Sequence, residues 1–379
     1  MIKMIKSSDL IETGDILSDR PYYHYLLLSS KDVKPSAITR EIFSYIFHNL
    51  SERLIFSKDN ETISVVTVLK KFRFIIQKID ATQYILIYFN LSNESIKQPL
   101  ENAIARIKWL VFSWMSPEDL DSFENYSSDY DVINLYTSYD PYYLLKKYSK
   151  IQPGLHVDYH ERWYKPRSIE VNIKIPKGDA REFLDTILQQ KITETVKLKF
   201  KAKFSNPGEA TISIDKDGKV IHEHGELRAT EKIVNDVVQK TSTKLVDFSK
   251  YATFRSYSKL SDGSFDLTDY KPAQPFYYTF KMPEEKMEEF SVKLENLLTI
   301  SKKSLQIYGV RLSRENRDFS CLTYIPTDRS ELKMKFIHDD ESPILVVDPL
   351  NASPLGILTL TRILSEKMTW STKLSGFYE

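Results

Sequence analysis

Histidines are the residues of this chain whose spacing could form a reactive centre. His222 and His224 are two residues apart in an alternating stretch, so in a strand their rings share a face and Glu223 points the other way. His156 and His160 are four residues apart. Together the two pairs would supply the four nitrogen ligands that zinc accepts. Because the spacing matches no established zinc signature, we expect no bound metal, and His222 and His224 remain weak candidates.

Other catalytic chemistry has little support in the sequence. There is no glycine-rich phosphate loop, no dinucleotide-binding fingerprint and no nucleophile elbow. Cys321 falls in an apolar stretch, 319–325, which favours a small buried side chain over a nucleophile. The run 338–341 (His-Asp-Asp-Glu) reads as a turn, and it would need further carboxylates to hold a metal. We therefore expect no catalytic residues and no cofactor.

A row of lysines is the stronger candidate for a binding site. Alternate residues near position 200 are lysine, and those between them are apolar, so a strand would present every lysine on one face. Their spacing of about 6.8 Å along a strand could follow a nucleic-acid backbone by charge. The alternatives are an acidic protein surface as the partner, such as the Asp- and Tyr-rich connector, or protection of a sheet edge against aggregation. The row consists of Lys197, Lys199, Lys201 and Lys203.

Overall composition limits the class of protein. The chain has 379 residues, of which 41% are hydrophobic, and 53 Lys plus Arg against 52 Asp plus Glu leave a net charge of +1. This composition excludes a mostly disordered chain, and it confines any nucleic-acid contact to a local patch. The single cysteine fits a reducing compartment. No signal-peptide pattern is seen, and the apolar run 109–115 is too short to span a membrane, so we expect a cytoplasmic protein.

One order of elements recurs along the chain. Periodicity predicts a strand at 168–175, a helix at 179–189, three strands between 194 and 224, and a helix at 229–241. A hairpin is predicted at Asp217-Gly218. The order returns 107 residues later, with Pro176 matching Pro283 and Phe183 matching Phe290. A looser copy covers the N-terminal part, beginning with a strand at 22–29. These matches favour duplication.

The predicted fold class is α+β, with three tandem modules of order β-α-β-β-β(-β)-α and antiparallel sheets that carry helices on one face. In the first module, strands near 72–90 are apolar on both faces, so we expect both to be covered by another module or a second copy of the chain. The predicted boundaries are 1–115 for the first module, 116–167 for a Tyr-rich connector, 168–247 for the second module, 248–274 for a connector and 275–379 for the third module.

The middle unit resembles the repeat of the TATA-binding-protein fold in its order of elements. The resemblance covers about 168–243 and rests on Asn206-Pro207-Gly208, the strand 210–214, the Asp217-Gly218 turn and the closing helix. Longin and roadblock modules have similar orders. The TATA-binding-protein fold inserts aromatic side chains into DNA from the open face of its sheet, whereas this unit presents Lys and Thr on that face. The resemblance therefore implies a fold and carries over no binding residues.

Three classes of function follow, in order of preference. The first is a non-catalytic interaction or scaffold protein that binds a protein partner or itself. The second is a nucleic-acid-binding protein that uses the lysine row. The third is a metal-dependent enzyme that uses the histidine pairs His156/His160 and His222/His224.

Overall fold

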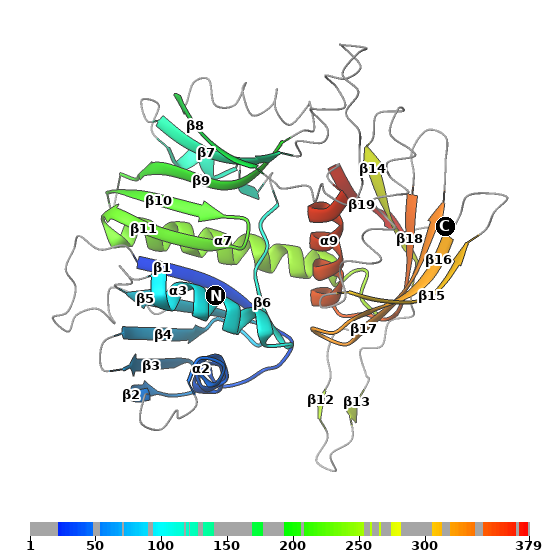
Figure 1. Cartoon of the computed structure of the whole chain (residues 1–379), viewed down its shortest axis with the longest axis horizontal. Helices are drawn as coiled ribbons and strands as arrows, with labels where there is room; N and C mark the ends of the chain where they lie inside the picture. Colours follow the sequence, from blue (N-terminus) through cyan, green and yellow to red (C-terminus); the bar gives the residue numbers. More distant parts are fainter. Residues whose placement is uncertain are drawn as a thin grey trace, which may run out of the picture. The chain divides into compact units, whose positions relative to one another are not determined.

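The computed structural model shows a mixed α+β protein with antiparallel sheets and, in its described part, four α-helices (Figure 1). The chain forms two compact units. Unit 1 comprises Met1–Leu27, Val33–Ile104 and Phe112–Val238, and unit 2 comprises Leu28–Asp32, Ala105–Val111 and Gln239–Glu379. The structure describes residues 22–47, 54–69, 72–89, 94–116, 119–120, 122–127, 132–139, 169–176, 193–205, 208–253, 258–259, 265–266, 274–281, 305–312, 319–337, 344–368 and 371–377.

An 11-stranded sheet is the framework of unit 1. Its strands run in the order β2-β3-β4-β5-β1-β11-β10-β9-β7-β8, and β6 also pairs with β1. A short 3-10 helix, η1 (Ser122–Tyr126), precedes β7. The strands are β1 (Tyr22–Ser29), β2 (Leu54–Asp59), β3 (Ile63–Val68), β4 (Phe72–Lys78), β5 (Gln83–Phe89), β6 (Leu110–Phe112), β7 (Val132–Tyr139), β8 (Ile169–Pro176), β9 (Thr193–Lys203), β10 (Glu209–Asp215) and β11 (Lys219–Gly225).

The sheet is continuous because β1 pairs with β11. The two strands are antiparallel, with Tyr22 opposite His222 and Tyr25 opposite Lys219. The short β6 takes up the edge of β1 beyond this stretch, where Ser113 N–H donates to the carbonyl of Leu26 at 2.9 Å. At the predicted hairpin, β10 and β11 pair and Gly218 has φ +66°, a conformation that glycine adopts without strain. That turn is confirmed.

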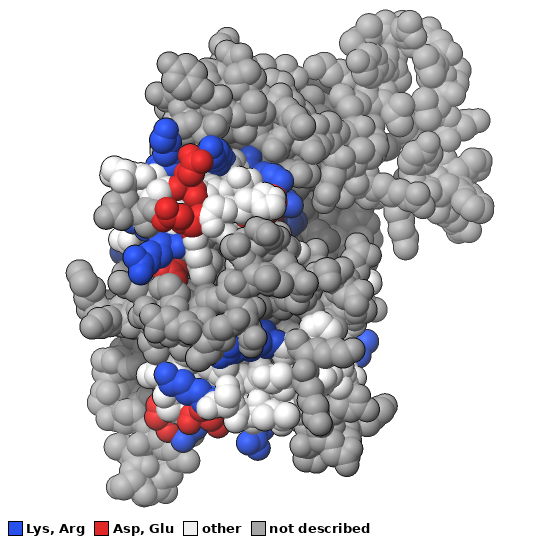
Figure 2. Space-filling model, turned by 90° about the vertical axis from the view of Figure 1, so that its left-hand side faces the viewer, with Lys and Arg blue, Asp and Glu red and all other residues white. Residues whose placement is uncertain are grey.

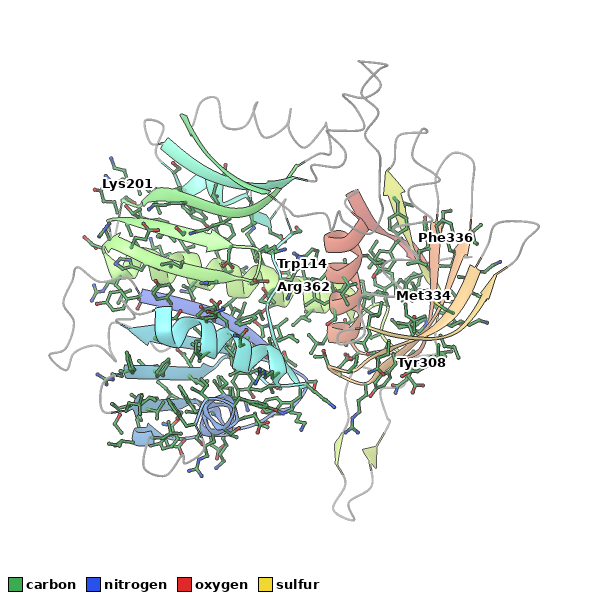
Figure 3. The ribbon with its side chains drawn as sticks, in the orientation of Figure 1. Trp114, Lys201, Tyr308, Met334, Phe336 and Arg362 are labelled. Atoms are coloured by element: carbon green, nitrogen blue, oxygen red, sulfur yellow. The ribbon has the colours of Figure 1, made fainter. Side chains whose placement is uncertain are left out.

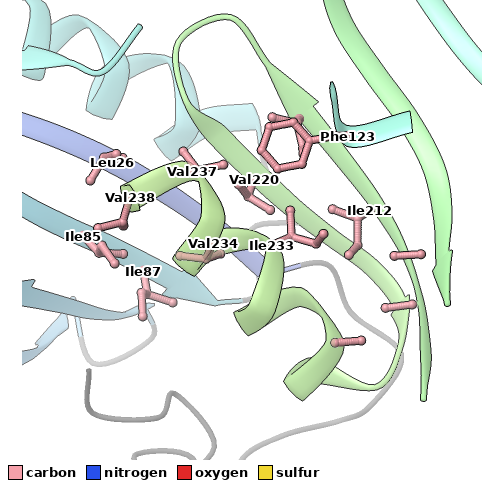
Figure 4. Packing of buried hydrophobic residues seen from close by; sticks show 14 of the residues in the cluster. Leu26, Ile85, Ile87, Phe123, Ile212, Val220, Ile233, Val234, Val237 and Val238 are labelled. Carbon is pink, nitrogen blue, oxygen red and sulfur yellow. The ribbon is translucent and has the colours of Figure 1, made fainter. Parts of the chain in front are cut away.

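Helices cover both faces of the unit 1 sheet. On one face, α2 (Pro35–Ser44) places Phe43 edge-on to Phe74 of β4, with ring centroids 5.0 Å apart. On the other face, Ile75 belongs to the same buried cluster as Val234 and Val238 of α7 (Leu227–Phe248). Figure 4 shows Ile85 and Ile87 beside these valines.

The expectation that both faces of these strands are covered is therefore confirmed, and a helix of the following segment contributes to the cover. The helices on the two faces belong to different predicted modules, α2 to the first and α7 to the second. The other described helix of the N-terminal segment, besides α2, is α3 (Glu94–Arg106), which contains Pro99.

Unit 2 has a six-stranded antiparallel sheet in the order β15-β16-β17-β18-β14-β19. One face of it forms a core with α9 (Pro354–Met368), in which Met334 and Phe336 pack with Ile357 and Leu360. The strands are β14 (Phe276–Lys281), β15 (Gln306–Leu312), β16 (Phe319–Ile325), β17 (Ser330–Ile337), β18 (Ile344–Asn351) and β19 (Ser371–Phe377), and a separate pair is formed by β12 (Ser258–Lys259) and β13 (Phe265–Asp266).

The strand orders agree between the first and last segments of the chain. In both, the first strand pairs with the last strand of a four-stranded meander, giving β2-β3-β4-β5-β1 and β15-β16-β17-β18-β14; the strand after the closing helix, β6 or β19, pairs with that first strand. The middle segment differs, because among the described strands β8 pairs with β7 alone, whereas β14 lies between β18 and β19. Pro176 ends β8, while Phe183, Pro283 and Phe290 lie outside the described residues.

The range 116–167, expected to be a connector, contributes a strand to the sheet. β7 lies between β9 and β8, with Leu135 opposite Leu198 on one side and Ile173 on the other. The expected connector 248–274 includes β12 and β13, and its Thr253 N–H donates to the carbonyl of Ala352 at 3.0 Å. None of the helices in the described ranges combines the length and apolar character needed to cross a bilayer.

Candidate functional site

The lysine row lies on one face of β9, as its alternation predicts. Leu198, Phe200 and Ala202 are buried in the unit 1 core, so the lysines between them point to the other face. Three of these lysines are half-buried, and Lys203 is exposed. The row therefore exists, but it is less open than the sequence suggests.

Carboxylates from neighbouring strands neutralise much of this row. Lys199 forms an ion pair with Glu223 of β11, and Ser213 of β10 donates a hydrogen bond to the same carboxylate at 2.8 Å. Lys201 Nζ lies 2.7 Å from Glu209 Oε1 of β10. Cross-strand pairs of opposite charge stabilise a sheet, and they lower the net positive potential that a phosphate would meet.

The charged network continues across the sheet to α3. Lys219 of β11 is only 8% exposed, and its Nζ lies 2.9 Å from Glu101 Oε1 and 3.8 Å from Asp215 Oδ2. The Tyr25 hydroxyl donates to Glu101 at 2.6 Å, so the Tyr88 hydroxyl, 2.9 Å away, must donate to Tyr25. Burial is the main cause that raises the pKa of both tyrosines. These contacts describe a structural network.

Lys197 lies opposite Asp215 of β10. Burial lowers its pKa, and the charges of Glu223 and Asp215 oppose that shift. In the face of the molecule that Figure 2 shows, acidic and basic side chains among the coloured residues stand next to one another and form no continuous basic stripe.

The two histidines of β11 lie in different environments. His222 is buried at 1% exposure, and its Nδ1 lies 2.7 Å from Thr230 Oγ1 of α7, whereas His224 is exposed. Burial lowers the pKa of His222 to about 4. Within the described ranges, no three His, Cys, Asp or Glu side chains are grouped to hold a metal. His156 and His160 lie outside those ranges, as does the run 338–341.

Sequence reasoning missed a third histidine, His24. It is 2% exposed on β1, opposite Val220 of β11, and the strand pairing brings it near His222. Burial lowers the pKa of His24 to about 4, and the neighbouring His222 contributes to the shift. The signal was not local, because only the pairing of β1 with β11 brings these residues together.

Cys321 behaves as the sequence predicts. It is 3% exposed in the unit 2 core, and burial raises the pKa of its thiol, which makes the thiolate less available.

Unit 2 contains a second lysine pair that the sequence analysis did not select. In β17, Lys333 and Lys335 are exposed and alternate with the buried Leu332, Met334 and Phe336. The signal was present in the alternation of Ser330–Ile337. Figure 3 labels the buried Met334 and Phe336, and Tyr308 near the margin of unit 2.

The face of unit 2 that carries these lysines also carries aromatic side chains. Tyr308 of β15 pairs with Leu322 of β16, which pairs with Lys333, so the three share a face. Tyr308 is 52% exposed and Leu322 is 46% exposed. Tyr324, half-buried, is two residues along β16 from Leu322 on the same face. We call Tyr308, Leu322, Tyr324, Lys333 and Lys335 the open face of unit 2.

Comparison with known proteins gives no assignment: neither a protein-family model nor a curated protein matches this chain.

Proposed function

We propose that this chain is a non-catalytic interaction protein built from three tandem α+β modules, and that it binds a macromolecular partner. Duplication is supported by the strand order that the first and last segments share, with β1 and β14 in equivalent places. The middle segment is the divergent copy, in which β7 separates β8 from β9. We propose a cytoplasmic location, since the single cysteine fits a reducing compartment.

The open face of unit 2 is the observation that carries this proposal. In the first segment, the sheet face opposite α2 is buried, with Ile75 and Ile85 at 0% and 1% exposure. In the last segment, the face opposite α9 exposes about half of Tyr308 and of Leu322. Large apolar side chains gathered on one exposed surface are typical of interaction sites.

Affinity capture from extracts of the source cells tests the proposal. The double variant Tyr308→Ser, Leu322→Ser should lose a partner that the wild-type chain retains. The matched control is Tyr45→Ser, Val246→Ser, because these residues are 44% and 64% exposed and lie elsewhere. Equal recovery by wild type and both variants, in extracts and in self-association measured by light scattering, would contradict the proposal.

Nucleic-acid binding by the β9 lysine row is a second candidate function. It is favoured by the common face of Lys197, Lys199, Lys201 and Lys203, and weakened by the carboxylates of Glu209 and Glu223 beside them. Four phosphate contacts would give a log-log salt slope of about −3.6 for duplex DNA or about −2.8 for a single strand. Replacing the four lysines with serine should remove that slope if the row is the site.

A further inference from the structure

We propose that the open face of unit 2 binds single-stranded nucleic acid, with Tyr308 and Tyr324 stacking on bases and Lys333 and Lys335 contacting phosphates. This inference rests on the proposed function, because it names the class of the macromolecular partner.

The aromatic side chains stand at a useful separation. Tyr308 is opposite Leu322, and Tyr324 is opposite Gln306, so the two tyrosines are diagonal neighbours on adjacent strands. Diagonal neighbours on one face lie about 7–8 Å apart, which allows two long side chains to contact successive parts of one flexible strand. Leu322 lies opposite Tyr308 and two residues along β16 from Tyr324, and it is exposed, so it adds an apolar contact for a base. Rings on an open sheet are a recurring platform for unpaired bases.

The lysines of this face differ from those of β9 in their partners. Within the described residues, Lys333 and Lys335 form no ion pair, whereas Lys199 and Lys201 each have a carboxylate partner. Lys335 lies opposite Ser320 on β16. It is two residues along β17 from Lys333 and therefore on the same face as Tyr308 and Leu322. Ammonium groups that form no ion pair, beside exposed rings, supply both interactions that a single strand needs.

Two carboxylates on the same face oppose phosphate binding. Glu331 lies opposite Tyr324, and Asp348 lies opposite Lys333. Charge complementarity is therefore local, and we expect weak binding that stacking dominates. With two phosphate contacts, the log-log salt slope for a single strand is about −1.4. Neutralising the carboxylates with Glu331→Gln and Asp348→Asn should strengthen binding.

A single strand fits this face better than a duplex does. Stacking on Tyr308 requires a base whose flat surface is free, and in a duplex both flat surfaces of each base are already stacked. Tighter binding of single strands than of a duplex would thus distinguish stacking on the open face from attraction by charge alone.

The test is fluorescence anisotropy of the full chain with fluorescein-labelled 12-nucleotide oligouridylate and oligothymidylate, at two salt concentrations. Tyr308→Ala should weaken binding at least fivefold, the lower limit for loss of one stacked base. Tyr308→Phe should retain binding, because the ring is kept. Lys333→Ser, Lys335→Ser should flatten the salt slope. The matched control Lys34→Ser, Lys58→Ser changes two exposed lysines outside both candidate sites and should leave binding unchanged.

Three results would overturn the proposal: no binding by wild type at low salt, undiminished binding by a folded Tyr308→Ala variant, or a duplex bound as tightly as the single strands. Thermal melts confirm folding of each variant, and the 52% exposure of Tyr308 predicts little loss of stability. If oligonucleotide binding fails while the Tyr308→Ser, Leu322→Ser variant still loses a captured protein, the occupant is a protein and the proposed function stands.

Discussion

Lys199 of β9 and Glu223 of β11 form an ion pair across the intervening strand β10, where Ser213 donates a hydrogen bond to the same carboxylate. The side chains of the pair are 30% and 21% exposed, so water screens them only in part. The row of lysines that suggests a polyanion site is thus also part of a network that connects three strands.

A double-mutant cycle on Lys199→Met and Glu223→Gln tests this pairing. We expect a coupling energy of about 1 kcal/mol, at the upper end for partly exposed pairs. Urea unfolding of wild type, both single variants and the double variant gives the value. The control pair is Lys250 and Asp247, which is exposed by 61% and 56% and should show a smaller coupling. A zero coupling would show that the ion pair of Lys199 and Glu223 contributes nothing to stability.

The hydrogen-bond chain from Tyr88 through Tyr25 to Glu101 should stabilise unit 1. Tyr25→Phe removes the hydroxyl that bonds both neighbours, and we expect the free energy of unfolding to fall by about 1–2 kcal/mol. Glu101→Gln removes the nearest counter-charge of the buried Lys219 and leaves the carboxylate of Asp215, at 3.8 Å, so it should cost more than Tyr25→Phe does. Chemical denaturation measures both. A smaller loss for Glu101→Gln would contradict the role of Lys219 in the network.

Stability should depend on pH through His24 and His222. Both have a pKa of about 4 in the folded chain, below the value of about 6.5 for a free histidine, so the unfolded chain binds more protons between those values. The free energy of unfolding should therefore fall as pH falls from 6.5 to 4, by up to about 3 kcal/mol for each histidine. Asp215, with its pKa raised by burial to about 6, acts in the opposite direction.

His24→Gln isolates this dependence. Its unfolding free energy should change less between pH 7 and pH 4.5 than that of the wild type, whereas the exposed His224→Gln control should follow the wild type. Parallel pH profiles for all three proteins would show that His24 is not the titrating group.

Gly356 near the start of α9 should not tolerate alanine. Alanine normally stabilises a helix relative to glycine by about 1 kcal/mol. Here an added Cβ would overlap Ser330 Oγ and lie 2.8 Å from Asp328 Oδ2. Ser330 Oγ donates to Asp328 and accepts from Ser353 N–H, so its displacement disturbs both contacts.

We expect Gly356→Ala to destabilise the chain by about 1–2 kcal/mol in thermal or urea unfolding. Adding Ser330→Gly should relieve part of the clash, so the double variant should lose less free energy of unfolding than the two single variants lose together. A stabilised Gly356→Ala variant would mean that this end of the helix is less crowded than its geometry indicates.

Local patterns in the sequence predict the strands and the faces of their side chains. The alternation at Lys197–Lys203 places the lysines correctly, and the Asp217-Gly218 turn joins the strands that were expected. Pairing between distant strands has no such local signature, because any alternating strand offers the same backbone hydrogen bonds. For this reason neither the insertion of β7 nor the junction of β1 with β11 was predicted, and His24 was not considered as a neighbour of His222.

The candidate site shows the same limit. Sequence alone identified a lysine row but not the carboxylates of Glu209 and Glu223, since these come from other strands. It also passed over Lys333 and Lys335, whose neighbours Tyr308 and Leu322 join them only through cross-strand register. Exposure and charge compensation depend on the assembled sheet.

The pairing of β1 with β11 has a consequence for synthesis of the chain. Tyr22 and His222 are 200 residues apart, so at roughly 5–20 residues per second the edge of β1 has no β11 to pair with for about 10–40 seconds after it is made. An unpaired strand edge invites wrong partners during that interval. By contrast, β14 and β19 pair over Phe276–Lys281 within a much shorter stretch of chain. Ribosome-bound fragments that end before β11 should therefore need chaperone protection, whereas the edge of β14 is paired soon after β19 emerges.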